Sequence, residues 1–115
     1  MKNTICGFNQ DAVIGIRKVV KEDYKIKTIK LDCTDLVILR WIIWRSPMNS
    51  TEFGVPASYG ALISEMPAID ITNGTFYSKL KKMVRLGILT KTEGDPGRSE
   101  SFYIPGEKYR QLLAD

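Results

Sequence analysis

The sequence predicts a mainly α domain with a small β-hairpin near its C-terminal end. Apolar residues recur at helical spacing in several stretches, and one of these, LVILRWIIW, is apolar nearly all round. Two short β-type runs flank a turn rich in Gly and Pro. A chain of 115 residues with 43% hydrophobic residues has the size of one domain with its own core. We therefore expect a single domain over residues 1–115, with a helical extension over about residues 10–24.

The N-terminal part is expected to form two helices joined by a short extended segment. Asn9-Gln10-Asp11 can cap a helix over residues 11–24, whose apolar residues form one stripe: Ala12, Val13, Ile16, Val19 and Val20. Residues 25–31 favour an extended conformation. A second helix is expected over residues 35–45, and Ser46-Pro47 ends it. Its Trp41 and Trp44 are expected in the core rather than as a stacking platform for single strands.

The middle of the chain has the spacing of a helix-turn-helix. After a polar loop over residues 48–56, Ser58 can cap a short helix over residues 59–66. Pro67 marks the end of that helix. Only about four residues follow before Thr72 offers a new N-cap, which is the tight turn that joins two such helices.

The helix over residues 72–86 is expected to carry the function. Its apolar residues fall on one stripe, which we place in the core: Phe76, Leu80, Met83 and Val84. At roughly 100° per residue, the opposite face then carries Gly74, Thr75, Ser78, Lys82 and Arg85, with Thr72, Lys79 and Lys81 on the flanks. No acid interrupts that face, which predicts an acid-free, cationic ridge turned to solvent. Its positive N-terminal dipole and its cations suit entry into a DNA major groove.

A hairpin is expected directly after this helix. Residues 88–92 and 99–104 are β-type runs around a Gly/Pro turn, and Arg98 lies at the tip. With the helix-turn-helix, this wing predicts a winged helix-turn-helix fold. Such a hairpin beside a reading helix commonly lies along the DNA backbone or the minor groove. A last helix over about residues 107–114 is expected to close the core.

The net charge of +4 is concentrated in two stretches. Residues 72–98 hold six Lys and Arg against two acids, and residues 17–30 hold the same numbers. We expect the first stretch to face phosphates. For the second stretch no other feature indicates contact with nucleic acid, so the sequence favours a solvated surface there.

The run NGTFYSKLKKMVRLGIL is similar to the reading helix of PadR-like regulators, and residues 58–104 resemble the winged-helix pattern of small bacterial and phage regulators. Residues 34–66, with VPASYGALI, also resemble the winged-helix modules of phage and plasmid replication-initiation proteins, including the DnaD-like group. Either resemblance implies that the helix beginning at residues 72–75 reads bases and that the hairpin over residues 91–98 touches the backbone. The chain ends at Asp115 without the long dimer helix of PadR-like proteins, which leaves the dimer geometry open.

The sequence thus predicts a sequence-specific duplex DNA-binding protein, a transcriptional regulator of a phage or other mobile element. Replication initiation at an origin and docking of a protein partner are the alternatives. The residues expected to face bases are Thr72, Asn73, Thr75, Ser78, Lys79 and Lys82. Those expected at phosphates or in the wing are Ser58, Tyr59, Tyr77, Lys81, Arg85, Lys91, Arg98 and Ser99. For Tyr59 and Tyr77, a half-buried position at the rim is equally open.

No enzymatic activity, cofactor or metal site is expected, because the chain has no histidine and its acids are scattered. We expect a homodimer, since one reading helix covers about half a site and the stripe over residues 11–24 is available for pairing. A transcription or replication protein is a further candidate partner. The two cysteines are far apart in the sequence, which favours a reducing compartment. The polar start is unlike a signal peptide, and no run is apolar enough to span a bilayer, so we expect a cytoplasmic protein without membrane contact.

Overall fold

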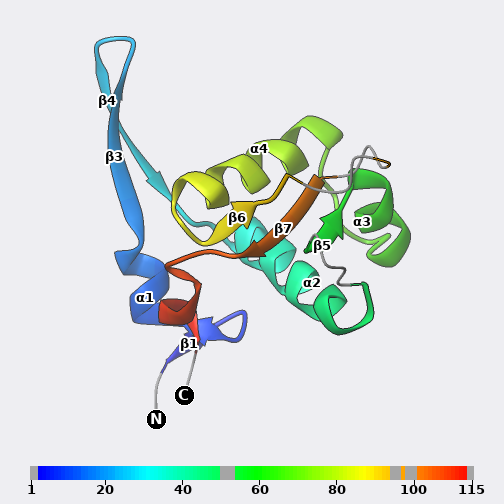
Figure 1. Cartoon of the computed structure of the whole chain (residues 1–115). Helices are drawn as coiled ribbons and strands as arrows, with labels where there is room; N and C mark the ends of the chain where they lie inside the picture. The colour runs from blue at the N-terminus through cyan, green and yellow to red at the C-terminus, as the bar shows by residue number, and fades with distance from the viewer. Residues whose placement is uncertain (1–2, 50–53, 94–96, 98–100, 114–115) are drawn as a thin grey trace.

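A computed structural model describes residues 3–49, 54–93, 97 and 101–113. Along these residues the chain forms four α-helices, seven strands and a 3-10 helix (Figure 1). The helices are α1 (Gln10–Gly15), α2 (Cys33–Asn49), α3 (Tyr59–Glu65) and α4 (Asn73–Arg85), and the 3-10 helix is η1 (Tyr109–Leu112). The strands are β1 (Thr4–Ile5), β2 (Phe8–Asn9), β3 (Arg17–Glu22), β4 (Lys25–Lys30), β5 (Val55–Ala57), β6 (Leu89–Lys91) and β7 (Ser101–Pro105).

The prediction of a mainly α winged helix-turn-helix domain is wrong, because the described residues form an α+β fold with three sheets. Two of the sheets are hairpins, β1–β2 and β3–β4, and the third has the strand order β5-β7-β6. In the third sheet β7 pairs antiparallel with both neighbours, so that Val55 and Lys91 both lie opposite Tyr103. The expected hairpin therefore exists as β6 and β7, but it belongs to a larger sheet that also includes β5.

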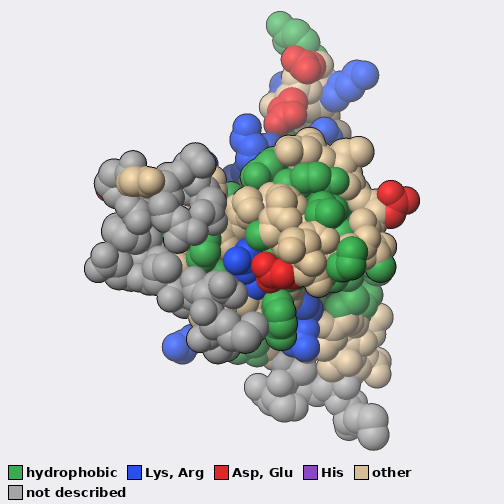
Figure 2. Space-filling model, turned by 90° about the vertical axis from the view of Figure 1, so that its right-hand side faces the viewer, with side chains coloured by type: hydrophobic (Ala, Val, Ile, Leu, Met, Phe, Trp, Pro, Cys, Tyr) green, Lys and Arg blue, Asp and Glu red, His purple; other side chains and the backbone are tan. Residues whose placement is uncertain are grey.

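Residues 17–24 depart furthest from the expected helix, whereas the extended segment expected over residues 25–31 is confirmed as β4. The helix that Asn9 caps ends at Gly15, and β3 and β4 then pair over six residues from Arg17↔Lys30 to Glu22↔Lys25. The stripe that fitted helical spacing is split, since Val13 and Ile16 are buried in the chain's own core while Val19 is exposed. β-branched residues are frequent in this segment and favour strands, which is the signal that outweighs the helical spacing. The hairpin projects from the body, and we call residues 17–30 the arm (Figures 1 and 2).

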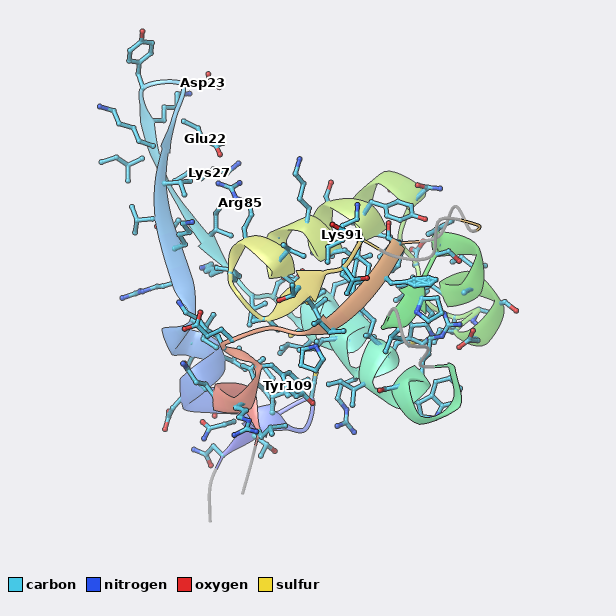
Figure 3. All side chains as sticks on the ribbon, viewed as in Figure 1. Glu22, Asp23, Lys27, Arg85, Lys91 and Tyr109 are labelled. Carbon is cyan, nitrogen blue, oxygen red and sulfur yellow. The ribbon has the colours of Figure 1, made fainter. Side chains whose placement is uncertain are left out.

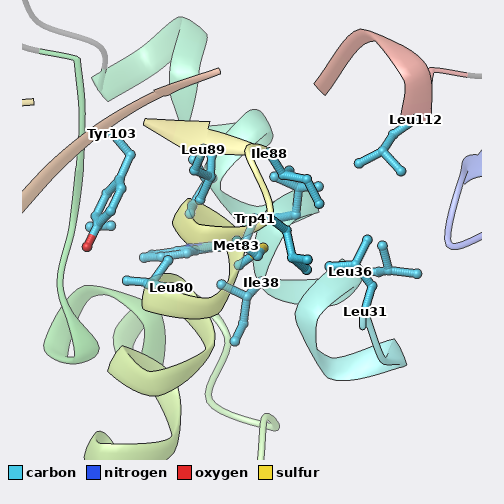
Figure 4. Packing of buried hydrophobic residues seen from close by; sticks show 14 of the residues in the cluster. Leu31, Leu36, Ile38, Trp41, Leu80, Met83, Ile88, Leu89, Tyr103 and Leu112 are labelled. Atoms are coloured by element: carbon cyan, nitrogen blue, oxygen red, sulfur yellow. The ribbon is translucent and has the colours of Figure 1, made fainter. Parts of the chain in front are cut away.

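The core lies between α2, α4 and the three-stranded sheet (Figure 4). The apolar stripe expected on α4 is confirmed, because Phe76, Leu80 and Met83 are fully buried and Val84 packs against them. On α2, Trp41 is buried as expected and its ring meets Phe76 edge to face at 6.0 Å. The expectation for Trp44 is wrong, since 55% of this residue is exposed.

The helices expected after residue 32 are present with shifted ends. α3 and α4 begin after the predicted caps, and the hydroxyls of Ser58 and Thr72 accept from the amides of Ala61 and Thr75. α2 runs through Ser46-Pro47 to Asn49. A proline removes its own backbone donor and crowds the turn before it, but this cost does not end α2, in which only two residues follow Pro47. The expected last helix is only the short η1.

A tight backbone approach closes the sheet end near η1. Gly106 donates to the carbonyl oxygen of Ile88 at 2.7 Å, and an added Cβ would overlap the carbonyl oxygen of Gly87 and lie 2.8 Å from the carbonyl carbon of Ile88. Because both are backbone atoms, neither can swing aside. We expect Gly106→Ala to lower the unfolding free energy by about 3 kcal/mol in urea titrations. Gly60→Ala, with no atom within 4 Å of the added Cβ, is the control and should cost nothing.

Candidate nucleic-acid interface

The N-terminal half of α4 presents small hydrogen-bonding residues to solvent. Thr72, Asn73, Thr75 and Ser78 are all exposed, as the sequence predicts. The Thr72 hydroxyl accepts from the backbone amide of Thr75 at 3.2 Å and donates to the Thr75 hydroxyl at 2.9 Å. Because buried Phe76 and Leu80 anchor the opposite side of the helix, the orientation of these polar residues is fixed by the core.

Two carboxylates from the start of α2 lie beside α4. Asp32 and Asp35 form a reciprocal cap: the Asp35 amide donates to Asp32 Oδ1 at 2.8 Å, and the Asp32 amide donates to Asp35 Oδ2 at 2.9 Å. Asp35 is completely buried, whereas about half of the Asp32 side chain is exposed. The cap therefore holds negative charge at one fixed position against the middle of α4.

The expected acid-free ridge on α4 is therefore wrong. Lys79 Nζ lies 2.7 Å from Asp32 Oδ2, and Lys82 Nζ pairs with Asp35 and lies 3.6 Å from Asp32 Oδ2. These ion pairs hold the two lysine side chains against Asp32 and Asp35, so that only 16% of the Lys79 side chain and 23% of the Lys82 side chain are exposed. Both residues were expected to face bases, but here they join α4 to α2.

The ion pairs and burial act oppositely on the two carboxyls. Burial alone would raise the pKa of Asp32, but hydrogen bonds from the Lys79 side chain and the Asp35 amide, with the charge of Lys82, hold that pKa well below its usual range. Burial raises the pKa of Asp35 above its usual value, although Lys82 and the Asp32 amide both donate to it. The exposed member of the pair is thus the more firmly ionised.

Acid is expected to destabilise the fold partly through Asp32. The pKa of Asp32 is lower in the folded chain than in the unfolded chain. Its full contribution to the free energy of unfolding is therefore present above the ordinary value of 3.8 and is lost as the pH falls further. The raised pKa of Asp35 acts in the opposite sense, because the folded chain holds that proton more tightly. Asp32→Asn keeps a capping acceptor, and its urea midpoint should fall less between about pH 5 and about pH 3 than that of the parent chain. Equal falls would contradict the ion pairing.

A groove separates the C-terminal half of α4 from the arm. Arg85 reaches across it, with one guanidinium nitrogen 3.3 Å from Glu22 Oε1 on β3. The groove has a volume of about 590 Å³, and we call it the basic groove because five cations and two acids line it. Its lining residues are Glu22, Lys27, Thr28, Ile29, Lys30, Asp32, Ser78, Lys81, Lys82 and Arg85.

The register of the arm explains why Glu22, Lys27 and Ile29 line the basic groove together. Lys18 and Ile29 are paired, as are Val20 and Lys27, so these residues share one face with Glu22. Ile29 is buried on that face, and Figure 3 shows Glu22 and Lys27 on the side toward Arg85. The sequence assigned no contact to Lys27 and Lys30, although it placed both on an extended segment that the structure confirms as β4.

A second hollow continues the basic groove toward the start of α4. It has a volume of about 500 Å³ and is lined by Thr72, Gly74, Thr75, Ser78, Lys79 and Lys82. Ser78 and Lys82 line both hollows, which are therefore contiguous along the helix. One extended ligand can contact the polar start of α4 and the cations near its end together.

The other residues expected at phosphates are divided between structural positions and the rim. Ser58 caps α3, the Tyr59 hydroxyl donates to the Ile71 carbonyl oxygen at 2.7 Å, and the Tyr77 hydroxyl accepts from the Tyr59 amide at 3.1 Å. These contacts fix the turn between α3 and α4. Lys81 and Lys91 are exposed, but Lys91 lines neither hollow. Arg98 and Ser99 lie outside the described residues.

Comparison of the chain with protein-family models, with curated proteins and with solved structures gave no match. The resemblances to PadR-like regulators and DnaD-like initiator modules therefore stay predictions. Fold and interface together define an α+β domain with a basic groove between a helix and a projecting hairpin. Across the described ranges, none of the helices combines the length and hydropathy of a membrane-spanning segment.

The stripe proposed for homodimer pairing does not exist as such a surface. Val13 and Ile16 pack inside the chain with Ala12 against the same core, and Val19 and Val20 belong to the arm. The homodimer stays a prediction without this support.

Proposed function

We propose that the chain binds duplex DNA, with the exposed start of α4 in the major groove and the cations of the basic groove on flanking phosphates. The observation that carries this proposal is the continuity of the two hollows along α4, polar at one end and cationic at the other. An α-helix fits the major groove, which is about 12 Å wide, and Thr and Ser hydroxyls there can meet base edges. The positive dipole end of α4 adds to its attraction for the polyanion.

The ion pairs on α4 limit which cations can neutralise phosphates. Lys79 and Lys82 are already matched by two carboxylates, so their charges are largely compensated within the chain. Lys27, Lys30, Lys81 and Arg85 remain, although Arg85 shares its charge with Glu22. About four phosphate contacts are therefore the number that this surface supports.

Base reading by α4 would make the protein sequence-specific. Thr75 and Ser78 are the exposed residues best placed for it, since Lys79 is held by Asp32. A transcriptional regulator of a phage or other mobile element is the role we propose for such a protein. Replication initiation needs the same surface, and selection of bound fragments from random duplexes, followed by mapping of the recovered motif to promoters or origins, separates the two roles.

The proposal is tested by measuring binding to duplex DNA at several salt concentrations. Neutralising about four phosphates predicts a slope of about −3.6 for the logarithm of the binding constant against the logarithm of salt concentration. Fluorescence anisotropy of a labelled duplex gives the binding constant at each salt concentration, and hence the slope. A slope near zero, or no binding even at low salt, would overturn the proposal and favour docking of a protein partner.

A further inference from the structure

The arm leaves large apolar side chains in solvent. Tyr24 is 98% exposed, Ile26 79% and Val19 64%. Among the described residues, β3 and β4 pair only with each other. A lone two-stranded hairpin is marginally stable in water, and apolar groups exposed along it indicate a surface that it contacts.

The turn at the tip is built in an unusual way. Asp23 and Tyr24 both adopt the left-handed backbone conformation, with φ angles of 51° and 64°. A two-residue hairpin turn of this kind normally takes Asn, Asp or Gly, because bulkier residues are strained there. A strained aromatic residue at the most exposed point of the arm suggests a use for its side chain outside the fold.

We infer that the arm is a second DNA contact whose tip, carrying Tyr24, enters the minor groove next to the major groove that receives α4. The inference rests on the proposed function. Two strands about 4.8 Å apart, with their side chains, form a ribbon wider than the minor groove of about 6 Å, so only the tip can enter. Six residues per strand span roughly 20 Å, which exceeds the groove depth of about 7.5 Å. The rest of the arm then lies outside the minor groove, along its edges.

The charge of the arm favours duplex DNA over other occupants. Six basic and two acidic residues make it strongly cationic, so the arm of a second copy would be repelled. Lys27 and Lys30 line the same groove as Lys81 and Arg85, so one polyanion can contact the arm and α4 together. A flat membrane at the tip could not reach the cations inside that groove.

The test compares the full chain with two variants, Tyr24→Ala and Tyr24→Phe. Each is titrated against two duplexes of about 20 base pairs, one with G·C pairs and one in which inosine replaces guanine, which removes the minor-groove amino group alone. We expect the parent and Tyr24→Phe to bind the inosine duplex about fivefold more tightly than the G·C duplex. Tyr24→Ala should bind both duplexes alike, and should therefore bind the inosine duplex at least about fivefold more weakly than the parent does.

The outcomes separate this inference from the proposed function. If the parent binds both duplexes equally well, the arm inference fails while duplex binding stands. If the parent binds neither duplex at low salt, the proposed function fails first. Sedimentation with phosphatidylserine vesicles and sedimentation velocity of the protein alone complete the test. Vesicle binding or self-association that Tyr24→Ala abolishes would assign the tip to a membrane or to a second copy, and would overturn the inference.

Discussion

Reversing two charges of the basic groove, Lys27→Glu together with Lys81→Glu, is expected to weaken duplex binding about a hundredfold near 0.1 M salt. Each lost phosphate contact should reduce the binding constant about eightfold at that salt, and the introduced carboxylates add repulsion. The slope against salt should become shallower by about 1.8. Anisotropy titrations at several salt concentrations measure both effects. The expected loss of affinity is large because both side chains line the basic groove, one from the arm and one from α4.

The control for this pair is Lys108→Glu with Arg110→Glu. It changes the net charge equally, but neither residue, one just before η1 and the other within it, lines the basic groove. We expect it to weaken binding less than about fivefold, through the overall field alone. Similar losses for the two double variants would show that net charge, and not the groove, determines binding.

Phe76→Ala is expected to lower the unfolding free energy by about 4 kcal/mol. Its ring is fully buried on the inner face of α4 and lies among Trp41, Tyr59 and Tyr77, with centroid distances of 6.0, 6.1 and 4.9 Å. Truncation would leave a cavity beneath the surface that we assign to DNA. Urea unfolding followed by far-UV circular dichroism gives the midpoint and slope that determine this value.

Trp44→Ala is the matched control for Phe76→Ala. It removes a still larger ring, but one that is 55% exposed on α2. We expect a loss of less than about 1.5 kcal/mol, because most of the removed surface already meets water. If the free energy of unfolding fell equally in the two variants, the packing of α4 against the core through Phe76 would be contradicted.

The part of the fold that could be predicted from the sequence is the part with one clear local period. The stripe of α4 repeats apolar residues at helical spacing and is flanked by a capping threonine and by Gly87, which has the expected positive φ of 81°. Its inward face and its exposed polar start were therefore predictable. The same holds for α3 and for the pairing of β6 with β7.

The hairpin of the arm could not be predicted, although its second strand was expected to be extended, because the segment over residues 16–30 fits two periods. Ile16, Val19 and Val20 have helical spacing, while KIKTIK alternates as a strand does. The choice is made by distant contacts, since Ile29 is buried against the body and Glu22 reaches Arg85. Strand β5 was missed for a similar reason: its three residues carry too little pattern, and it forms only by pairing with β7.

The charge of the interface depends on contacts that no local pattern contains. Lys79 and Asp32 are 47 residues apart in the chain, yet their side chains form an ion pair. Every charged residue in a helical projection of residues 72–86 is basic, whereas the folded chain places two carboxylates of another segment beside these cations. Asp32 and Asp35 lie just before and at the start of the helix expected over residues 35–45, so no local pattern linked them to residues 72–86.

The most direct test of the central claim follows the backbone amide signals of the ¹⁵N-labelled chain while a short duplex is added. If α4 and the arm hold DNA between them, the largest shifts should fall in residues 74–85 and 20–30, with little change over η1. Shifts concentrated around Trp44 or η1, with none along the basic groove, would contradict the claim.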